Sequence, residues 1–475
     1  MLFNSLDFAV FLPLVFILYW FVFKRSLSAQ NGLLLVASYV FYAWWDWRFL
    51  GLIVFSTLVD YAVARGLVKA EKSQKRQLLL GISLACNLGL LGFFKYYNFF
   101  VDSWVDAWAH LGVSLSVQTL SIILPVGISF YTFQTLSYTI DVYRKQLEPT
   151  TNLIQFATYV AFFPQLVAGP IERAKQLLPQ FAMPRVFNSE FAIRGVSLII
   201  WGLFKKMVVA DNCAFFVNQL FDGSGNYSSA ELFLGTVLFA FQIYGDFSGY
   251  SDIAIGVARL FGFRLMTNFA FPYFSRDIAE FWRRWHISLS TWFRDYVYIP
   301  LGGSRGSMWL NIRNVLVVFI VSGFWHGANW TFIIWGGLHA MLFLPLLVRQ
   351  KNRHHVAGTR IQLYQLPRIL YTFVVVCLAW VFFRADTVSL AWTMLEDMLR
   401  FDSGTLHVFY QSSKSVLLST ITVFSILVLM FYEFRTVQTN QREVVLTTYH
   451  AVFIAILLVF MGVYKSPADF IYFQF

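Results

Sequence analysis

Charged residues are scarce in this sequence: Asp, Glu, Lys and Arg make up 13% of its 475 residues, against roughly 25% in a soluble domain. Cysteine is scarce too, because only three are present and no two of them have the spacing of a metal-binding or redox motif. The histidines form no His-Glu-x-x-His pattern. These absences exclude a large soluble domain and a disulfide framework, and we expect no catalytic metal.

Hydrophobic residues, in contrast, make up 58% of the chain and are grouped into long runs. We count about ten to twelve runs close to the roughly 17–25 residues that a membrane-spanning helix needs. No Lys or Arg precedes the first run, and Lys24 and Arg25 close it, so we interpret it as a retained helix and not as a signal peptide. The sequence therefore predicts an all-α polytopic protein embedded in a membrane. The clearest runs are residues 8–23, 78–94, 120–140, 230–258, 330–348 and 416–430.

Basic residues are distributed unevenly between the loops that join these runs. If the N-terminus faces outward and Lys205 and Lys206 are interfacial, most Lys and Arg residues lie on the inner side, as the positive-inside rule requires. The C-terminus then also lies outside. This distribution explains the net charge of +11, so we expect no nucleic-acid binding. The exceptions are Arg48, Lys95, Arg384, Arg400, Lys414 and Lys465.

No Gly/Ser-rich linker, heptad pattern or internal repeat divides the chain, and we predict one membrane domain over residues 1–475. Within it, residues 1–118 are expected to form scaffold helices and residues 119–348 the catalytic core. Residues 349–475 are expected to form C-terminal helices and an aromatic tail. The longest polar interruption, residues 264–313, is predicted to be a cytosolic loop.

Proline and glycine interrupt the apolar runs at three places. Leu124-Pro-Val-Gly127 lies inside one run, Pro164 and Pro170 end another, and several glycines between residues 323 and 337 divide a third. Non-helical backbone at membrane depth is tolerated only where protein buries it or where it lines a watery cavity. These breaks therefore favour re-entrant segments around an internal cavity, and the alternative is a helix kinked by proline.

His326 lies in the segment Val321-Ser-Gly-Phe-Trp-His-Gly-Ala-Asn-Trp330, with apolar sequence on both sides. An ionisable group within a span is costly and tends to face a protein interior or a cavity. Burial also favours the neutral imidazole, which can accept the proton of a hydroxyl and act as a general base. The alternative is a core histidine that is hydrogen-bonded to a carbonyl, and position alone does not decide between the two.

His286 lies in a stretch rich in Trp and Arg, residues 280–295, on the side predicted to be cytosolic. Arginine matches the geometry of phosphate, so this stretch could hold an anionic donor such as a phosphate-bearing thioester carrier. The alternative is an interfacial belt of aromatic and basic residues. The candidate donor-binding residues are Arg283, Arg284, Arg294 and Trp285.

Two acids, Asp246 and Asp252, fall late in the apolar run 230–258 and need partners at membrane depth. We expect arginines of the following loop to pair with them, and whether they carry protons or form structural ion pairs stays open. The tail at residues 470–475 is too aromatic for an exposed, disordered end, so we expect it to dock. Tyr472 supplies its central hydroxyl.

Two motifs, Arg283-Arg-Trp-His-Ile-Ser-Leu-Ser-Thr-Trp292 and Gly323-Phe-Trp-His-Gly-Ala-Asn-Trp330, resemble those of the membrane-bound O-acyltransferase (MBOAT) superfamily. The closest likeness is to its bacterial alginate O-acetylation branch. Residues 162–172, residues 246–256 and the opening Met1-Leu-Phe-Asn-Ser resemble the same branch, so the likeness runs nearly end to end. The resemblance implies a ring of the predicted helices around a central tunnel.

The resemblance also implies roles for individual residues. His326 is implied to be the catalytic histidine, and His286 the second histidine of the family pair. Asn329, a backbone N–H or protonated His286 is expected to stabilise the oxyanion, with Trp325 as a supporting residue. Tyr472 matches an aromatic tail whose tyrosine is proposed to relay the acyl group.

The activity implied by the resemblance is O-acetyl transfer in a bacterial cytoplasmic membrane. No bound cofactor is expected: acetyl-CoA or another acyl thioester is the donor on the cytosolic face. An exported polysaccharide or cell-wall glycan is the final acceptor, and a separate periplasmic acetyltransferase is the implied partner. Competing hypotheses are a transporter or flippase, a lipid O-acyltransferase of the same superfamily, and a catalytically silent scaffold. The sequence leaves open the glycan, the donor, the identity of the partner and the oligomeric state.

Overall fold

The computed structural model describes residues 1–117, 119–222, 225–353, 355, 360–402, 404–465, 468 and 470–471. Every regular element within these ranges is a helix, which confirms the all-α prediction. Among the described residues, seven helices are long and apolar enough to cross a membrane, and two apolar helices, Leu6–Val22 and Thr448–Met461, are shorter. The chain is a multi-pass membrane protein. Fewer long helices form than the apolar runs suggested, because several runs are divided into short helices.

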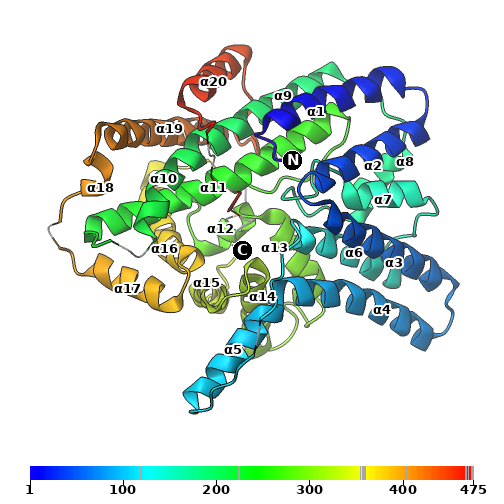
Figure 1. Cartoon of the computed structure of the whole chain (residues 1–475), viewed down its shortest axis with the longest axis horizontal. Coiled ribbons are helices and arrows are strands. Elements are labelled where there is room, and N and C mark those ends of the chain that lie inside the picture. Colours follow the sequence, from blue (N-terminus) through cyan, green and yellow to red (C-terminus); the bar gives the residue numbers. More distant parts are fainter. Residues whose placement is uncertain are drawn as a thin grey trace. The chain divides into compact units, whose positions relative to one another are not determined.

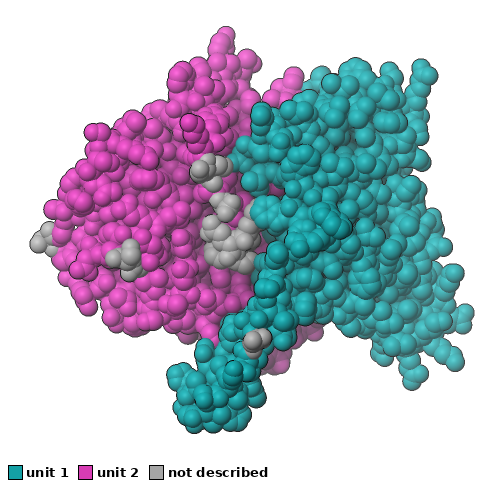
Figure 2. Space-filling view, in the orientation of Figure 1, with its two compact units in different colours: residues 1–192, 258–265 teal, residues 193–257, 266–475 magenta. Residues whose placement is uncertain are grey.

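The chain forms two compact units, coloured separately in Figure 2. The first comprises residues 1–192 and 258–265, and the second residues 193–257 and 266–475. These units do not test the predicted subdivision into residues 1–118, 119–348 and 349–475, which stays a prediction. The helices of the first unit, where η marks a π- or 3₁₀-helical turn, are α1 (Leu6–Ile17), η1 (Leu18–Val22), α2 (Leu27–Ala43), η2 (Trp47–Phe49), α3 (Leu50–Lys69), α4 (Ser73–Leu91), η3 (Gly92–Tyr96), α5 (Tyr97–His110), α6 (Ile128–Tyr143), α7 (Leu153–Ala161) and α8 (Ala174–Ala182).

The second unit holds most of the remaining helices (Figure 1). Two long helices, α9 and α11, have one end in the first unit. In chain order the elements are α9 (Ser189–Leu203), η4 (Phe204–Ala210), α10 (Asp211–Leu220), α11 (Ser229–Leu260), η5 (Pro272–Phe274), α12 (Ile278–Arg284), α13 (Ile287–Phe293), η6 (Arg294–Tyr298), α14 (Met308–His326), α15 (Trp330–Val348), η7 (Leu363–Gln365), α16 (Leu366–Arg384), α17 (Val388–Leu399), α18 (His407–Tyr410), α19 (Ser413–Gln438) and α20 (Thr448–Met461).

The predicted breaks in the first unit separate helices instead of kinking them. Gly127, two residues after Pro125, has φ +75° and precedes α6, a left-handed conformation that suits glycine. Residues 162–173 are buried and non-helical between α7 and α8, so the run that contains Pro164 and Pro170 ends as expected. That these segments surround a tunnel stays a prediction.

Buried polar side chains join α3, α4 and α6 within the first unit. Asp60 is fully buried and accepts hydrogen bonds from Asn87 Nδ2 at 2.9 Å, from Thr139 Oγ1 at 3.1 Å and from Ser83 Oγ. Hydrogen bonds between helices help to hold membrane proteins together, because lipid tails offer no competing partner. This network fixes three apolar helices to one another, which the apolar pattern alone did not indicate.

In the second unit, α14 and α15 are neighbours whose backbones touch (Figure 1). A Cβ at Gly323 would lie 2.2 Å from the carbonyl oxygen of Phe332, and one at Gly336 would lie 2.4 Å from that of Phe319. A larger side chain at either glycine would push the helices apart, so small residues set this contact. The contact fixes the end of α14, where His326 is the last residue.

A second close approach joins the end of α9 and η4 to α11. A Cβ at Gly249 would lie 2.7 Å from the carbonyl oxygen of Gly202, and one at Gly245 would lie 2.8 Å from that of Lys205. Turns of π-helix such as η4 are rare and often occur at functional sites. Lys205 and Lys206 are only 2% and 7% exposed, so they face the protein interior and not the membrane interface as expected.

Candidate active site

His326 is buried among aromatic rings at the end of α14 and is 2% exposed. Its ring centroid lies 5.0 Å from that of Trp325, 5.2 Å from Trp335 and 5.4 Å from Phe383. These rings come from α14, α15 and α16. Three helices that follow one another in the chain therefore surround one imidazole in the interior of the second unit.

His286 lies beside His326, with the two ring centroids 6.2 Å apart. It is fully buried and directly precedes α13 with φ 43° and ψ 55°, a left-handed conformation that is uncommon for residues other than glycine. Trp325 contacts both imidazoles, and its ring centroid lies 5.9 Å from that of His286. The structure thus brings together two histidines and a tryptophan that were predicted site residues from separate segments. Uncommon backbone conformations such as that of His286 are often found at functional sites.

Asn268 determines which nitrogen of His286 carries a proton. Its Oδ1 accepts hydrogen bonds from the Ser288 backbone N–H at 3.2 Å and from Ser288 Oγ at 2.9 Å, and it lies 3.1 Å from His286 Nδ1. A backbone N–H can only donate, so the amide atom that faces it is the oxygen, and Nδ1 must donate to the same oxygen. In the neutral ring, Nε2 is therefore the acceptor nitrogen.

Burial keeps the His286 ring neutral. It lowers the pKa of His286 to about 3, far below the ordinary value of 6.5. The hydrogen bond from Nδ1 to Asn268 is compatible with this neutral ring. The role expected for a protonated His286 at the oxyanion stays a prediction.

His339 is a third buried histidine among the described residues, and it was not among the residues predicted from the sequence. It is fully buried on α15, and its Nδ1 accepts a hydrogen bond from Trp282 Nε1 at 3.3 Å, so Nε2 carries the proton of its neutral ring. Its centroid lies 4.8 Å from that of Trp335, a ring that also contacts His326. An ionisable side chain inside the apolar run 330–348 was the signal that could have identified it.

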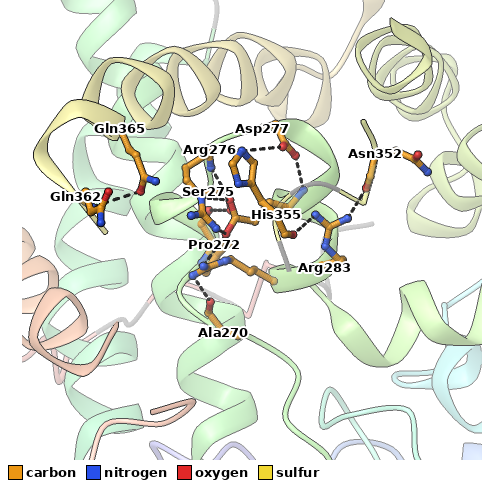
Figure 3. Close-up of polar contacts among 12 residues, drawn as sticks. Ala270, Pro272, Ser275, Arg276, Asp277, Arg283, Asn352, His355, Gln362 and Gln365 are labelled. Carbon is orange, nitrogen blue, oxygen red and sulfur yellow. Dashed lines mark hydrogen bonds and ion pairs between the residues drawn. The ribbon is translucent and has the colours of Figure 1, made fainter. Parts of the chain in front are cut away.

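Arg283, a candidate donor-binding residue, is bound within the protein. Its guanidinium donates to the carbonyl oxygen of Asn352 at 2.7 Å and to that of His355, as Figure 3 shows. The His355 ring in turn faces Asp277, with Nε2 3.7 Å from the carboxylate. Arg283 therefore joins α12 to the loop that follows α15.

The other donor-binding candidates lie in contrasting surroundings. Arg284 is buried and contacts the buried carboxylate of Glu280 at 2.7 Å, whereas the Arg294 side chain is 59% exposed and pairs with Asp295 at 2.7 Å. Trp285 is fully buried against other aromatic rings. The three arginines have different partners, and their role in donor binding stays a prediction.

Asn329 caps the start of α15. Its Oδ1 accepts a hydrogen bond from the Thr331 backbone N–H at 3.0 Å, and its Nδ2 donates to the carbonyl oxygen of Asp386 at 2.9 Å. Both polar groups of the side chain are therefore used in positioning the helix. A role for Asn329 at the oxyanion stays a prediction.

Each of the two acids late in α11 pairs with a lysine of η4, whereas arginines of the following loop were expected. Lys206 Nζ lies 2.8 Å from Asp246 Oδ1, and Lys205 Nζ lies 2.7 Å from Asp252 Oδ2. The lysines were visible in the sequence as an adjacent pair between apolar segments, but their partners depend on which helices meet.

The start of the aromatic tail docks against the second unit, as the sequence predicted. Phe470 and Ile471 are each 1% exposed, and the Ile471 backbone N–H donates to Asp246 Oδ2 at 2.6 Å. Phe470 packs with its centroid 6.2 Å from that of Phe247. Tyr472, the proposed relay, lies outside the described residues.

Comparison with known proteins gives consistent matches. The model of the membrane-bound O-acyltransferase family matches residues 144–385, a range that includes both histidines of the pair. The probable alginate O-acetylase AlgI of Pseudomonas aeruginosa is 42% identical over 436 residues, which cover 90% of this chain and 80% of that protein. The peptidoglycan O-acetyltransferase of Helicobacter pylori is 35% identical over 530 residues, which cover 100% of this chain and 98% of that protein. The teichoic acid D-alanyltransferase of Bacillus subtilis is 29% identical over 235 residues, which cover 46% of this chain and 57% of that protein.

The fold and site define a helical membrane protein with two buried imidazoles side by side, groups of the kind that transfer protons in enzymes. These matches identify the class further. The chain belongs to the membrane-bound O-acyltransferase family and is an O-acyltransferase.

Asn268 offers a test of whether the tautomer of His286 matters for this activity. Replacing Asn268 by leucine should lower the acyl-transfer rate about tenfold or more, because buried donors of His286 and Ser288 lose their acceptor. The Asn268→Asp variant keeps an acceptor oxygen, so it should fold even if the leucine variant fails to fold. The measurement is the initial rate of labelled acyl transfer per folded protein.

A neighbouring serine gives the matched control. Asn268 Nδ2 donates to Ser251 Oγ at 3.2 Å, so Ser251→Ala removes only the contact on the other side of the amide. It should leave the rate within about twofold of the wild type, as the loss of one modest hydrogen bond predicts. A folded Asn268→Leu protein with the wild-type rate would show that the orientation of His286 is not needed.

Proposed function

We propose that the protein transfers an acetyl group from a cytosolic acyl thioester, for the O-acetylation of an exported polysaccharide or cell-wall glycan. The observation that carries this proposal is the pair of buried imidazoles, His286 and His326, with ring centroids 6.2 Å apart. Relatives named as alginate and peptidoglycan O-acetylating enzymes support acetyl as the transferred group and an exported glycan as the acceptor.

His326 is the proposed general base. It accepts the proton of an incoming hydroxyl while the hydroxyl oxygen attacks the carbonyl carbon of the thioester, and a tetrahedral oxyanion forms. When this intermediate collapses, the carbon–sulfur bond breaks and the proton passes from His326 to the sulfur, which leaves as a thiol. The acetyl group is now an oxygen ester, and the imidazole is neutral again.

His286 is proposed to orient the reacting hydroxyl. Its neutral ring, with Nδ1 donating to Asn268, provides Nε2 as a hydrogen-bond acceptor. Trp325 packs against both imidazoles and helps to keep water away from the reacting atoms. In this scheme one imidazole moves the proton and the other fixes the geometry of attack.

The reaction is proposed to carry acetyl from one face of the membrane to the other. A charged thioester carrier cannot cross lipid, and the basic loops predicted to be cytosolic would attract it. Arg294, with its side chain 59% exposed, is the most accessible of the candidate arginines for this docking. The glycan and a separate periplasmic acetyltransferase would receive the group on the opposite face.

Purified protein in sealed vesicles tests the proposal. Radiolabelled acetyl-CoA is supplied on one side and a short glycan acceptor, with periplasmic extract, on the other. We expect labelled acetyl esters on the acceptor only in vesicles that contain the protein. Uptake of intact donor without ester formation would instead favour a transporter, and labelled lipid would favour a lipid acyltransferase.

Tyr472 is the proposed relay, and phenylalanine at this position should abolish transfer to the acceptor because it lacks the attacking hydroxyl. Docking of the preceding residues Phe470 and Ile471 supports this role. Trapped acetyl on the C-terminal peptide of the wild type, measured by mass spectrometry, should disappear in Tyr472→Phe. Tyr464→Phe is the control, because the Tyr464 hydroxyl donates to the Leu458 carbonyl and its side chain is exposed. Unchanged transfer by Tyr472→Phe would remove the relay and leave the rest of the proposal standing.

A further inference from the structure

The chain beyond α20 follows η4 and the helix after it. Asn212 Nδ2 donates to the carbonyl oxygen of Met461 at 3.0 Å, and the Val463 backbone N–H donates to the carbonyl oxygen of Met207 at 3.0 Å. These contacts all lie within the second unit. The C-terminal segment is therefore hydrogen-bonded to η4 and α10 before the aromatic tail begins.

One ion pair then holds the segment at two further points. Lys206 Nζ donates to the carbonyl oxygen of Ala468 at 2.9 Å, and Asp246 Oδ2 accepts from the Ile471 backbone N–H at 2.6 Å. Lys206 and Asp246 are themselves 2.8 Å apart and buried. We name these two residues the tail anchor. Because its contacts are to backbone atoms, the anchor fixes the path of the chain whatever side chains the segment carries.

The tail anchor places the segment against a ring that contacts the histidine pair. Phe470 packs with its centroid 4.8 Å from that of Tyr250 and 6.2 Å from that of Phe247. Phe247 in turn lies edge-on to His286, with centroids 4.7 Å apart. A single aromatic ring therefore separates the anchored segment from the imidazole of His286.

The stability of the folded protein does not by itself explain why the charged pair Lys206 and Asp246 is buried. A buried ion pair costs so much desolvation that apolar side chains of similar size often stabilise a protein equally well. A carboxylate does provide what an apolar residue cannot, namely a strong, charge-assisted acceptor at a fixed position for a backbone N–H. Asp211, whose Oδ1 lies 2.9 Å from Lys206 Nζ, gives the lysine a second anion, so the lysine does not depend on Asp246 alone.

We propose that Lys206 and Asp246 are positioning residues for acyl transfer, which hold the C-terminal segment beside His286 so that the tail can receive the acyl group. This role rests on the proposed function. The adjacent pair, Lys205 and Asp252, comes from the same two elements. Among the described residues Lys205 also donates to Ser248, and neither residue of this pair is bonded to Ala468 or Ile471. It provides a matched control for the effect of breaking a buried ion pair.

The first measurement detects the position of the segment without any catalysis. In a chain whose native cysteines are replaced by alanine, an Ile471→Cys thiol should react slowly with N-ethylmaleimide, because Ile471 is 1% exposed. Adding Asp246→Leu should accelerate labelling about tenfold or more, since the loss of a charge-assisted hydrogen bond frees the segment. Adding Asp252→Leu should not. Equal labelling rates in the two variants would overturn the anchor.

The second measurement links the anchor to turnover. Asp246→Leu should lower kcat for acetyl transfer and leave KM for the thioester unchanged, because the anchor bonds to the C-terminal segment and is not among the residues proposed to hold the donor. Asp246→Asn, which keeps an acceptor oxygen and leaves Lys206 paired with Asp211, should recover part of kcat and remain testable if the leucine variant fails to fold. Faster labelling with unchanged kcat would overturn the positioning role. Failure of the proposed function would instead appear as full activity in a His326 variant, with the labelling difference intact.

Discussion

Substitution of His326 by alanine is expected to lower acetyl transfer by about 10²- to 10⁴-fold, the usual contribution of a general base. The imidazole is 2% exposed and lies 6.2 Å from that of His286, measured between ring centroids. In the proposed mechanism no other group receives the proton of the attacking hydroxyl. The measurement is acetyl on the exported glycan, with protein level and membrane insertion determined in parallel.

His339 provides the matched control for this loss. It is a buried neutral imidazole against the same Trp335 ring, but it accepts a hydrogen bond from Trp282 Nε1. Asparagine at either position preserves polarity and bulk, and in His339→Asn its oxygen can replace Nδ1 as the acceptor. We expect His326→Asn to be inactive and His339→Asn to keep most of the activity. Full acetylation by a normally inserted His326→Ala protein would reject the catalytic role.

Replacement of Glu280 by alanine is expected to lower the free energy of unfolding by about 3–5 kcal/mol, because it leaves two buried guanidinium groups without their anion. Glu280 is fully buried, and its carboxylate accepts from Arg276 Nη2 at 2.8 Å and from Arg284 Nη2 at 2.7 Å. Arg276 precedes α12 and Arg284 is the last residue of this helix, two residues before His286. A large decrease in the thermal unfolding midpoint in detergent, with loss of activity, should follow.

An exposed ion pair from the next helical segment is the control. Asp295 lies 2.7 Å from Arg294, whose side chain is 59% exposed. Because a solvated pair contributes little, Asp295→Ala should change the unfolding free energy by less than about 1 kcal/mol. Comparable destabilisation by the two substitutions would show that the Glu280 network does not hold α12 in place.

The Glu280 network also predicts how acid affects stability. Burial alone would raise the pKa of Glu280, but the hydrogen bonds from Arg276 and the charge of Arg284 outweigh it, so the pKa is lowered from its ordinary value of 4.5. A carboxyl with a lowered pKa stabilises the folded state fully above its ordinary value and loses this contribution as the pH falls through the lowered pKa. The wild type and Glu280→Ala should therefore converge in stability only below about pH 4.5.

Much of the architecture followed from local patterns. The apolar runs predicted helices, and every regular element in the described ranges is a helix. The run that contains Pro164 and Pro170 ends as expected because proline lacks the N–H that a continuing helix needs. His326 and His286 were selected as an ionisable group inside a span and as part of a family motif, and they do lie together. Apolar runs, prolines and short motifs each depend on residues that are adjacent in the chain, so they can be recognised from the sequence alone.

Other features depend on contacts between distant segments. Nothing near Asp246 in the sequence indicates that its partners are Lys206 and the Ile471 backbone, and the loop arginines expected for it are used elsewhere. Arg284, for example, pairs with Glu280, which lies one turn away on the same helix. Which partner a buried charge finds is decided by which helices meet.

The sequence by itself determined the helical, multi-pass class and the O-acyltransferase family, and it singled out His286 and His326, which lie together in the structure. The tertiary structure alone decided that Asn268 fixes the tautomer of His286, that His339 joins the aromatic cluster, and that an ion pair of η4 and α11 holds the chain end beside it. The physical reason is that helix formation and hydrophobicity are summed over adjacent residues. Hydrogen-bond partners in the interior depend instead on which distant segments meet, as where glycines let η4 and α11 approach closely.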